Sequence, residues 1–257
     1  MPSILFEEKD GLATITFNRP QKYNAFNKEM ALLMQQKLDE CKKDEIRCVI
    51  ITGSGKAFSS GQDLEEVVDP DGPEIEAIVG EHYNPIITRI RKLEKPVVAA
   101  VNGVAAGAGA NIALACDVVV ATNSASFIQA FSKIGLIPDS GGTFFLPRLV
   151  GWQKASALMM LGDKISAEEA ERMGMIYKVF HDETFNEESL KIAATLANMP
   201  TKGLAFTKTL LNKSFNIDFE KQLQEEEVYQ KKAGSTLDYK EGVEAFLEKR
   251  KPIFTGQ

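Results

Sequence analysis

Three glycine-bearing turns hold the residues whose types and spacing suit chemistry. In residues 57–64, Gly61 permits a positive φ, which can point the backbone amide of Gln62 into a cavity. In residues 102–111, Gly107 and its small neighbours precede a helical stretch, whose first amides are free donors. Two amides from separate turns can converge on one oxygen, as in an oxyanion hole. A plain surface turn and close helix–strand packing without a ligand are the alternatives for these two segments.

The third turn, residues 135–143, holds one carboxylate, Asp139, among apolar residues and just before Gly141 and Gly142. Apolar surroundings disfavour the charged form of a carboxylate and raise its pKa, which suits proton transfer near neutral pH. Asp139 can equally cap the helix that follows, since aspartate side chains accept hydrogen bonds from the first amides of a helix. This segment alone does not separate the two interpretations.

The elements that position these turns alternate between strands and helices. Apolar or alternating segments predict strands at residues 4–8, 12–17, 48–52, 96–101 and 118–121. Helices are expected between them, at residues 27–43 with Asn27 as the cap, at 75–93 with a kink at Pro85, and at 111–115. Inner strands that are apolar throughout are typical of a parallel sheet covered by helices. The sequence therefore predicts an α/β fold.

The chain changes character after Gly151. Ser166 and Glu169 form a capping box for a short helix. Further helices are expected at residues 187–198, 202–213, 219–233 and 237–250. We expect an α/β core that carries the chemistry in residues 1–190 and a helical C-terminal region in residues 191–257. Such a region packs either on its own core or on a neighbouring subunit.

Composition and charge exclude several classes of protein. The net charge of −6 argues against nucleic acid as a partner, which requires a basic face. No apolar run is long enough to cross a bilayer, so no membrane partner is expected, and residues 1–10 do not resemble a secretory signal. Cys41, Cys48 and Cys116 are interpreted as buried reduced thiols, which indicates a cytoplasmic protein. His82 and His181 have no ligand cluster around them, so no metal site is expected.

Four motifs in order resemble those of the enoyl-CoA hydratase/isomerase (crotonase) family. They are Asn18-Arg19-Pro20 with Asn24-Ala25, Phe58-x-x-Gly-x-Asp-Leu, Pro96-Val-x-Ala-x-Val-Asn-Gly with Gly107-Ala-Gly, and Ile137-Pro-Asp-Ser-Gly-Gly-Thr. The resemblance implies a crotonase-like spiral of ββα units, whose helical C-terminal region takes part in trimerisation. It implies an acyl-CoA thioester substrate and a homotrimer or a hexamer built as a dimer of trimers. No cofactor is expected, because coenzyme A is part of the substrate.

The same resemblance assigns roles to residues of the turns. The thioester oxygen accepts hydrogen bonds from the amides of Gln62 and Ala108. The residues expected to bind the substrate are Lys22, Tyr23, Ala25, Ser60, Asp63, Leu64, Gly107, Asn111 and Phe131.

Two departures from the family pattern indicate the reaction. A hydratase of this family uses two glutamates, and this chain has Asn111 and Phe131 at those positions. Asp139 stands where some family isomerases carry a single acid/base, and one carboxylate is enough to move a proton from the α to the γ carbon. The segment from Phe131 to Arg148 resembles the ring 1,2-epoxyphenylacetyl-CoA isomerase subgroup, which opens an arene epoxide to an oxepin thioester. The alternatives are an enoyl-CoA hydratase in which Asp139 positions water, and a non-catalytic subunit that binds acyl-CoA.

Overall fold

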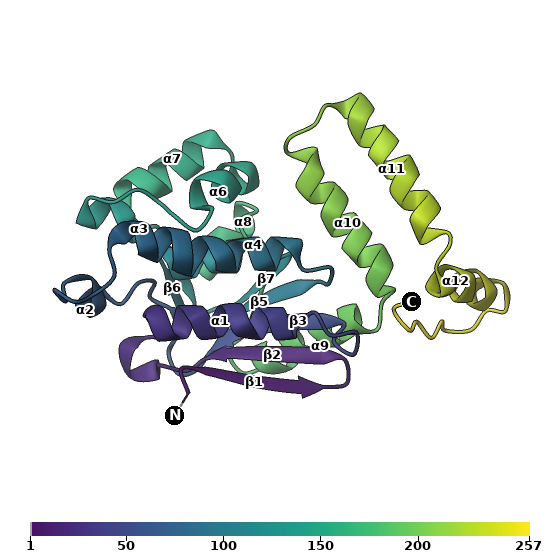
Figure 1. Cartoon of the computed structure of the whole chain (residues 1–257), viewed down its shortest axis with the longest axis horizontal. Helices are drawn as coiled ribbons and strands as arrows, with labels where there is room; N and C mark the ends of the chain where they lie inside the picture. The colour runs from purple at the N-terminus through teal and green to yellow at the C-terminus, as the bar shows by residue number, and fades with distance from the viewer. Residues whose placement is uncertain (1) are drawn as a thin grey trace.

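A six-stranded sheet forms the centre of the computed structural model, which describes residues 2–257 (Figure 1). Its strands lie in the order β1-β2-β3-β5-β7-β10. β1 is antiparallel to β2, and every later neighbouring pair is parallel. The predicted α/β fold with a mostly parallel sheet is confirmed. The strands are β1 (Ile4–Lys9), β2 (Leu12–Phe17), β3 (Cys48–Gly53), β5 (Val97–Val101), β7 (Val118–Thr122) and β10 (Lys178–Phe180).

Successive residues of the inner strands face two different layers of helices. In β3, Val49 and Ile51 belong to the main apolar core, whereas Cys48 and Ile50 pack in a second cluster with Phe185 of α9. Because successive side chains of a strand point to opposite faces, a strand buried on both faces has no polar side. This explains why the inner strands are apolar throughout.

A second sheet of short strands repeats the unit of strand, strand and helical segment. Each of β4, β6 and β8 follows a strand of the larger sheet and precedes a helical segment, as the expected spiral of ββα units requires. β4 pairs with β6 and β6 with β8 in parallel, and β9 is antiparallel to β8. The strands are β4 (Ala57–Ser59), β6 (Val104–Ala106), β8 (Ser126–Ile128) and β9 (Lys164–Ser166).

The helices of the core agree with the predicted ranges where a local signal exists. Asn27 caps α1 because its side chain accepts a hydrogen bond from the amide of Met30. Ser166 caps α8 in the same way, by accepting from the amide of Glu169. The helix expected at 111–115 begins earlier, at Ala108, directly after the glycine turn. The helical segments are η1 (Pro20–Lys22), α1 (Lys28–Glu40), α2 (Leu64–Val67), α5 (Ala108–Leu114), η3 (Ala130–Ile134), α6 (Gly142–Val150), α7 (Trp152–Leu161), α8 (Ala167–Arg172) and α9 (Phe185–Ala197).

The remaining helical stretch changes from a π-helix to an α-helix just before Pro85, where a kink or a division was expected. The stretch consists of α3 (Ile75–Ala77), the π-helix η2 (Ile78–Tyr83) and α4 (Asn84–Lys92). Proline has no amide to donate to the carbonyl four residues earlier, which is that of Glu81. That carbonyl instead accepts a hydrogen bond of 2.7 Å from Nε2 of Gln35 on α1. The end of η2 is therefore fixed by a contact from outside the helix.

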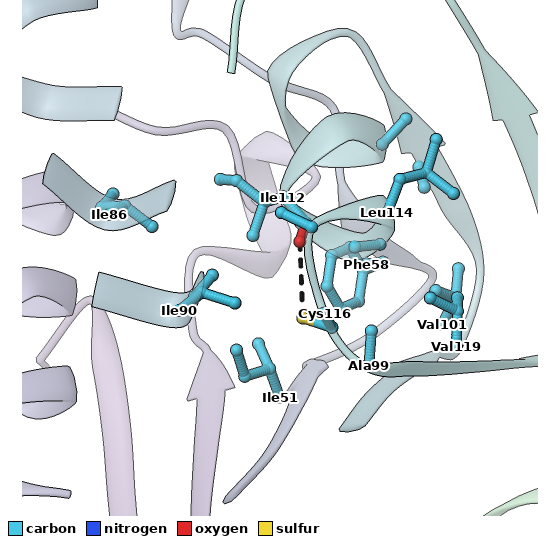
Figure 2. Close-up of a cluster of buried hydrophobic side chains, with 14 of the residues drawn as sticks. Ile51, Phe58, Ile86, Ile90, Ala99, Val101, Ile112, Leu114, Cys116 and Val119 are labelled. Carbon is cyan, nitrogen blue, oxygen red and sulfur yellow. Dashed lines mark hydrogen bonds between the residues drawn. The ribbon is translucent and has the colours of Figure 1, made fainter. Parts of the chain in front are cut away.

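The apolar cluster in Figure 2 fixes α5 against the larger sheet. Ile112 of α5 lies near Ile51 of β3 and Ile90 of α4, and all three belong to the main core. Sγ of Cys116 donates to the carbonyl of Ile112 at 3.4 Å, the contact drawn in the figure. The three cysteines are buried and unpaired, which confirms the interpretation as buried thiols. Every residue of α5 is buried, so the cluster determines where its first amide lies.

The last three helices stand beside the core as an arm (Figure 1). They are α10 (Thr201–Ser214), α11 (Phe219–Ala233) and α12 (Leu237–Leu247), so the last helix ends three residues before the expected Arg250. The expected boundary at residue 190 falls inside α9, whose Ala193 and Ala197 pack on the sheet. The core therefore extends to the end of α9. Within residues 2–257 no helix is both long and apolar enough to span a bilayer.

Candidate active site

The turns after β4 and β6 meet because these two strands are neighbours in the second sheet. Ser59 of β4 lies opposite Ala105 of β6 in a parallel pair, so both chains turn at the same edge. Gly61 has φ +91°, and a methyl group on it would lie 3.0 Å from the carbonyl oxygen of Ala106 and 3.4 Å from the amide nitrogen of Ala108. Only glycine allows this approach. The structure thus brings together the two turns that were predicted to supply donors.

The two predicted donor amides have no acceptor within residues 2–257. The neighbours of Gln62 are both engaged, since the carbonyl of Gly61 accepts from Phe26 at 2.7 Å and the amide of Asp63 donates to Phe26 at 2.8 Å. The amide of Gln62 donates to no protein acceptor in residues 2–257, and neither does that of Ala108, the first residue of α5. Two adjacent free amides form a site for an oxygen that gains negative charge.

Asp139 lies on the loop before α6 and is half-buried. Burial raises the pKa of this carboxyl from the ordinary 3.8 to about 6, against the opposing effect of the Ser140 hydroxyl, which donates to Oδ1 at 2.9 Å. The N-cap of α6 is Gly141, and no side chain caps the helix. The interpretation of Asp139 as a helix cap is therefore wrong. The carboxyl is free to exchange a proton near neutral pH.

Asn111 lies behind the Asp139 loop and is fully buried. Its Nδ2 donates to the carbonyl of Asp139 at 2.9 Å, and its Oδ1 accepts from Nε2 of Gln129 at 2.8 Å. The expected direct contact of Asn111 with substrate does not fit this position, because both ends of its amide are used inside the protein. Asn111 instead holds the loop that carries Asp139. No local motif marks Gln129, which lies 18 residues away in the sequence.

Phe131 closes the site beside the glycine turn. It is buried, and a methyl group on Gly107 would lie 3.8 Å from its ring. The ring therefore lies against the turn that leads to the Ala108 amide, as a residue lining an acyl pocket would. Between Phe131 and Asp139 in the sequence, three large apolar residues are exposed, namely Ile134, Leu136 and Ile137. Burial of the carboxyl is the physical cause of the raised pKa of Asp139.

Two segments that hold most of the residues expected to bind the substrate, 22–25 and 60–64, lie side by side. The amide of Ser60 donates to the carbonyl of Tyr23 at 3.0 Å, and the Ser60 hydroxyl donates to the carbonyl of Lys22 at 3.4 Å. Tyr23 and Leu64 are exposed next to this junction. The Lys22 ammonium forms an ion pair with Glu65. These groups form one exposed face beside the two free amides.

Asp63 and Ala25 have structural positions within that junction. Oδ2 of Asp63 pairs with the Arg19 guanidinium at 2.8 Å, and its Oδ1 accepts from the amide of Glu65 as the cap of α2. Arg19 also donates to the carbonyl of Ala25. Both predicted residues are buried, so they shape the turn rather than present side chains to a ligand.

The structure adds Tyr83, a residue that no sequence motif singles out. Tyr83 of η2 is fully buried, and its hydroxyl donates to the side chain of Gln62 at 2.9 Å. The two residues are 21 positions apart and share no motif. Only the division of the helical stretch at Pro85 hinted at an unusual conformation here.

Comparison with known proteins decides the family. The family model for enoyl-CoA hydratase/isomerase matches residues 7–257. The chain belongs to the enoyl-CoA hydratase/isomerase family. A 1,2-epoxyphenylacetyl-CoA isomerase of Escherichia coli (strain K12) is 47% identical over 261 residues, covering 100% of both chains. A probable enoyl-CoA hydratase of Rhodobacter capsulatus is 44% identical, covering 99% of this chain and 98% of that protein.

Solved structures of the enoyl-CoA hydratase/isomerase family have the same fold. The enoyl-CoA hydratase of Bacillus anthracis superposes with a TM-score of 0.95 at 31% identity, covering 99% of this chain and all of that one. A putative member from Mycobacterium abscessus superposes with a TM-score of 0.92 at 33% identity, covering 99% and 100% of the two chains. The family recognised from the four motifs and the crotonase fold are both confirmed. The chain is thus an enzyme of acyl-CoA thioesters.

Proposed function

We propose that the protein isomerises an acyl-CoA thioester. The reaction is the ring-opening of 1,2-epoxyphenylacetyl-CoA to oxepin-CoA, the shift of a double bond from 3-enoyl-CoA to 2-enoyl-CoA, or both. One observation carries the proposal: Asp139 has a pKa near 6, while Asn111 and Phe131 stand where a hydratase has its two glutamates. The 47% identity to a 1,2-epoxyphenylacetyl-CoA isomerase supports the same substrate.

The mechanism follows from the positions of the two amides and the carboxyl. The thioester oxygen lies between the amides of Gln62 and Ala108, which stabilise the negative charge of the enolate. Loss of one such donor typically costs about 3 kcal/mol of barrier. In the double-bond shift, ionised Asp139 takes a proton from the α carbon and returns it to the γ carbon, so the carboxylate is regenerated. Coenzyme A is part of the substrate, and the reaction needs no other cofactor.

A hydratase is the second candidate. The 44% identity to a probable enoyl-CoA hydratase favours it. In that reaction Asp139 alone would have to position and activate water. The family reaction uses two carboxylates, and an amide such as Asn111 has no useful basicity at neutral pH.

The proposal is tested by assaying the parent and Asp139→Asn with three substrates. They are 1,2-epoxyphenylacetyl-CoA, a linear 3-enoyl-CoA and crotonyl-CoA. We expect an isomerised product from one or both of the first two, and a loss of about a hundredfold or more in the variant. If the activity of Asp139→Asn stays within a few-fold of that of the parent, the role proposed for Asp139 is wrong. Rapid hydration of crotonyl-CoA with no isomerisation would favour the hydratase, and tight binding without turnover would favour a non-catalytic subunit.

We also propose that the chain assembles as a homotrimer or as a hexamer through its arm. Large apolar side chains of the arm are exposed in the single chain, among them Phe246, which is 82% exposed, and Leu247. Exposed apolar surface of this kind is typical of a protein interface. The molar mass from light scattering is the test, with a monomer as the contrary outcome. A cytoplasmic location is supported by the three unpaired cysteines.

A further inference from the structure

Both the oxygen and the nitrogen of the Gln62 side-chain amide are hydrogen-bonded within the protein. The free backbone amide of the same residue does not by itself require these contacts. Its Oε1 accepts from the Tyr83 hydroxyl at 2.9 Å, and its Nε2 donates to Oε2 of Glu66 at 2.9 Å. The Glu66 carboxylate also accepts from the amide of Lys28. An ionised carboxylate only accepts, so Nε2 must face Glu66 and Oε1 must face Tyr83. The Tyr83 hydroxyl is therefore the donor of this pair.

Tyr83 is fixed in place before any ligand binds. The residue is fully buried, and its ring packs against Phe26 with centroids 5.9 Å apart. Tyr83 is the last residue of the π-helix η2, which Gln35 holds through the carbonyls of Glu81 and His82. π-helical turns are rare and are often found at functional sites. The rigid placement allows one hydroxyl to define the position of a neighbouring side chain.

The hydroxyl of Tyr83 remains a donor at any working pH. Burial raises its pKa well above the ordinary 10, and the negative charges of Asp139, Glu66 and Asp63 add to this effect. A buried phenol costs free energy unless its hydroxyl is hydrogen-bonded. Here its partner is the side chain of the oxyanion-hole residue.

We propose that Tyr83 is a positioning residue of the reaction, which orients Gln62 through Oε1 and so holds the turn whose amide binds the thioester oxygen. This inference rests on the proposed function, because it assigns Tyr83 a role in that same oxyanion hole. Phe26 links the two residues a second time, since it packs on Tyr83 and forms backbone hydrogen bonds on either side of Gln62. Without the hydroxyl, Oε1 of Gln62 loses its donor, and the side chain is free to rotate.

The kinetic test uses full-length Tyr83→Phe, Gln62→Met and the double variant, with Tyr177→Phe as the matched control. Tyr177 is 66% exposed and distant in the fold, next to β10. We expect Tyr83→Phe to lower kcat about tenfold with KM within about twofold, because the donor acts mainly in the transition state. In the Gln62→Met background the same change should have little further effect, since Tyr83 acts through that side chain. Additive losses would overturn the proposal, as would an unchanged kcat in Tyr83→Phe.

A spectroscopic readout separates this inference from the proposed function. Isotope-edited infrared difference spectra of bound benzoyl-CoA report the hydrogen bonds to the thioester oxygen without any turnover. We expect the carbonyl frequency to be lowered in the parent and to move toward the free value in Tyr83→Phe, but not in Tyr177→Phe. A lowered frequency in a parent that isomerises no thioester would refute the proposed function alone. An unchanged frequency in a folded Tyr83→Phe would refute the role of Tyr83, and a parent that binds no thioester would refute both.

Discussion

Asp139 is half-buried, and its carboxyl accepts a hydrogen bond from the Ser140 hydroxyl. Burial is the main cause of its raised pKa, and the Ser140 hydroxyl opposes the shift without cancelling it. The carbonyl of the same residue accepts from Asn111, so the loop is held through its backbone and not through the carboxyl alone. A general base works best when its pKa lies near the pH of the medium. A pKa of about 6 meets this requirement for the base that we propose.

The pH dependence of the rate should report this carboxyl. Asp139 must be ionised to accept the α proton, and its pKa in the free protein is about 6. We therefore expect kcat/KM for a 3-enoyl-CoA to fall about tenfold per pH unit below this value and to level off above it. The measurement is the profile of kcat/KM between pH 5 and 8. A flat profile over that range would contradict the assignment.

The same shift predicts that Asp139→Asn stabilises the fold above pH 6. A pKa raised from 3.8 to about 6 means that the folded state binds the proton more tightly than the unfolded state. The parent therefore loses stability as the pH rises through this window, and the loss is complete above it. At pH 8 we expect the variant to be more stable than the parent by about 1–2 kcal/mol, a value already reduced because the carboxyl is partly exposed. At pH 4 we expect the two proteins to have similar free energies of unfolding.

Urea denaturation at the two pH values measures this difference. Asp163→Asn is the matched control, because Asp163 is exposed. An equal effect of Asp139→Asn at pH 4 and pH 8 would show that the carboxyl carries no such cost in the folded state.

At the scale of elements, the site is made where two neighbouring parallel strands end. β4 and β6 have only three residues each, yet their pairing places the turns after them at one edge. The packed α5 then presents its first amide at that edge. The oxyanion hole thus depends on a close contact between backbones, and Gly61 is the residue that permits it.

Gly61→Ala should therefore disable the site. Its methyl group would lie 3.0 Å from the carbonyl of Ala106, in addition to the strain of φ +91°. Gly174→Ala is the matched control, because Gly174 also has a positive φ, +78°, but its nearest neighbour would be at 3.6 Å. We expect Gly61→Ala to lose about a hundredfold in kcat, as when an oxyanion donor is lost, and Gly174→Ala to lose only stability, about 1 kcal/mol. Equal activities of the two folded variants would contradict this view.

The sequence predicted the elements that carry local signals. The apolar strands, the Asn27 cap and the division at Pro85 all follow from spacing and residue type, and the structure confirms them. The three-residue strands of the second sheet are too short to show a period. No residue range was predicted for α6 or α7, and α6 contains Pro147, which argues against a helix in the sequence.

The structure brings the predicted turns together, whereas the roles of their residues stay predictions and the residues that support the turns were not predicted. Gly61 and the apolar surroundings of Asp139 are local features, so the sequence indicated the two amides and the carboxyl. The burial of Asn111 behind the loop depends on Gln129, and the side chain of Gln62 depends on Tyr83. Such contacts between distant segments exist only once the chain has folded, and no spacing in the sequence reports them.

At the scale of the whole molecule, buried polar contacts determine how the arm lies against the core. Arg47, just before β3, donates to the hydroxyl of Thr201 at the start of α10 and to the carbonyl of Phe254 beyond α12. At the other end of α10, Phe215 packs on Phe144 of α6 with ring centroids 5.4 Å apart. α6 follows the Asp139 loop directly, so the arm is in contact with the element next to the acid/base.

Lys208 is the buried charge in the middle of this attachment, and its replacement tests how firmly the arm is held. Its Nζ lies 2.7 Å from Oδ2 of Asp117 and donates to the carbonyl of Lys95 at 3.1 Å. Lys208→Met leaves that carbonyl without its donor, although Arg91 still pairs with Asp117. We expect the free energy of unfolding to fall by about 2–3 kcal/mol. This is near the lower limit for breaking a buried ion pair, because Asp117 keeps Arg91 as a partner.

The matched control is Lys191→Met on α9, whose lysine pairs with Glu187 and Glu188 at the exposed surface. Exposed pairs contribute little, so this variant should unfold at the same urea concentration as the parent. Hydrogen exchange of the amides of α10 should rise in Lys208→Met and remain as in the parent in Lys191→Met, because Lys208 lies on α10 and joins it to Asp117 before β7, whereas Lys191 lies on α9. If both variants unfold alike, the buried pair does not hold the arm, and the apolar contact at Phe215 would have to account for its orientation.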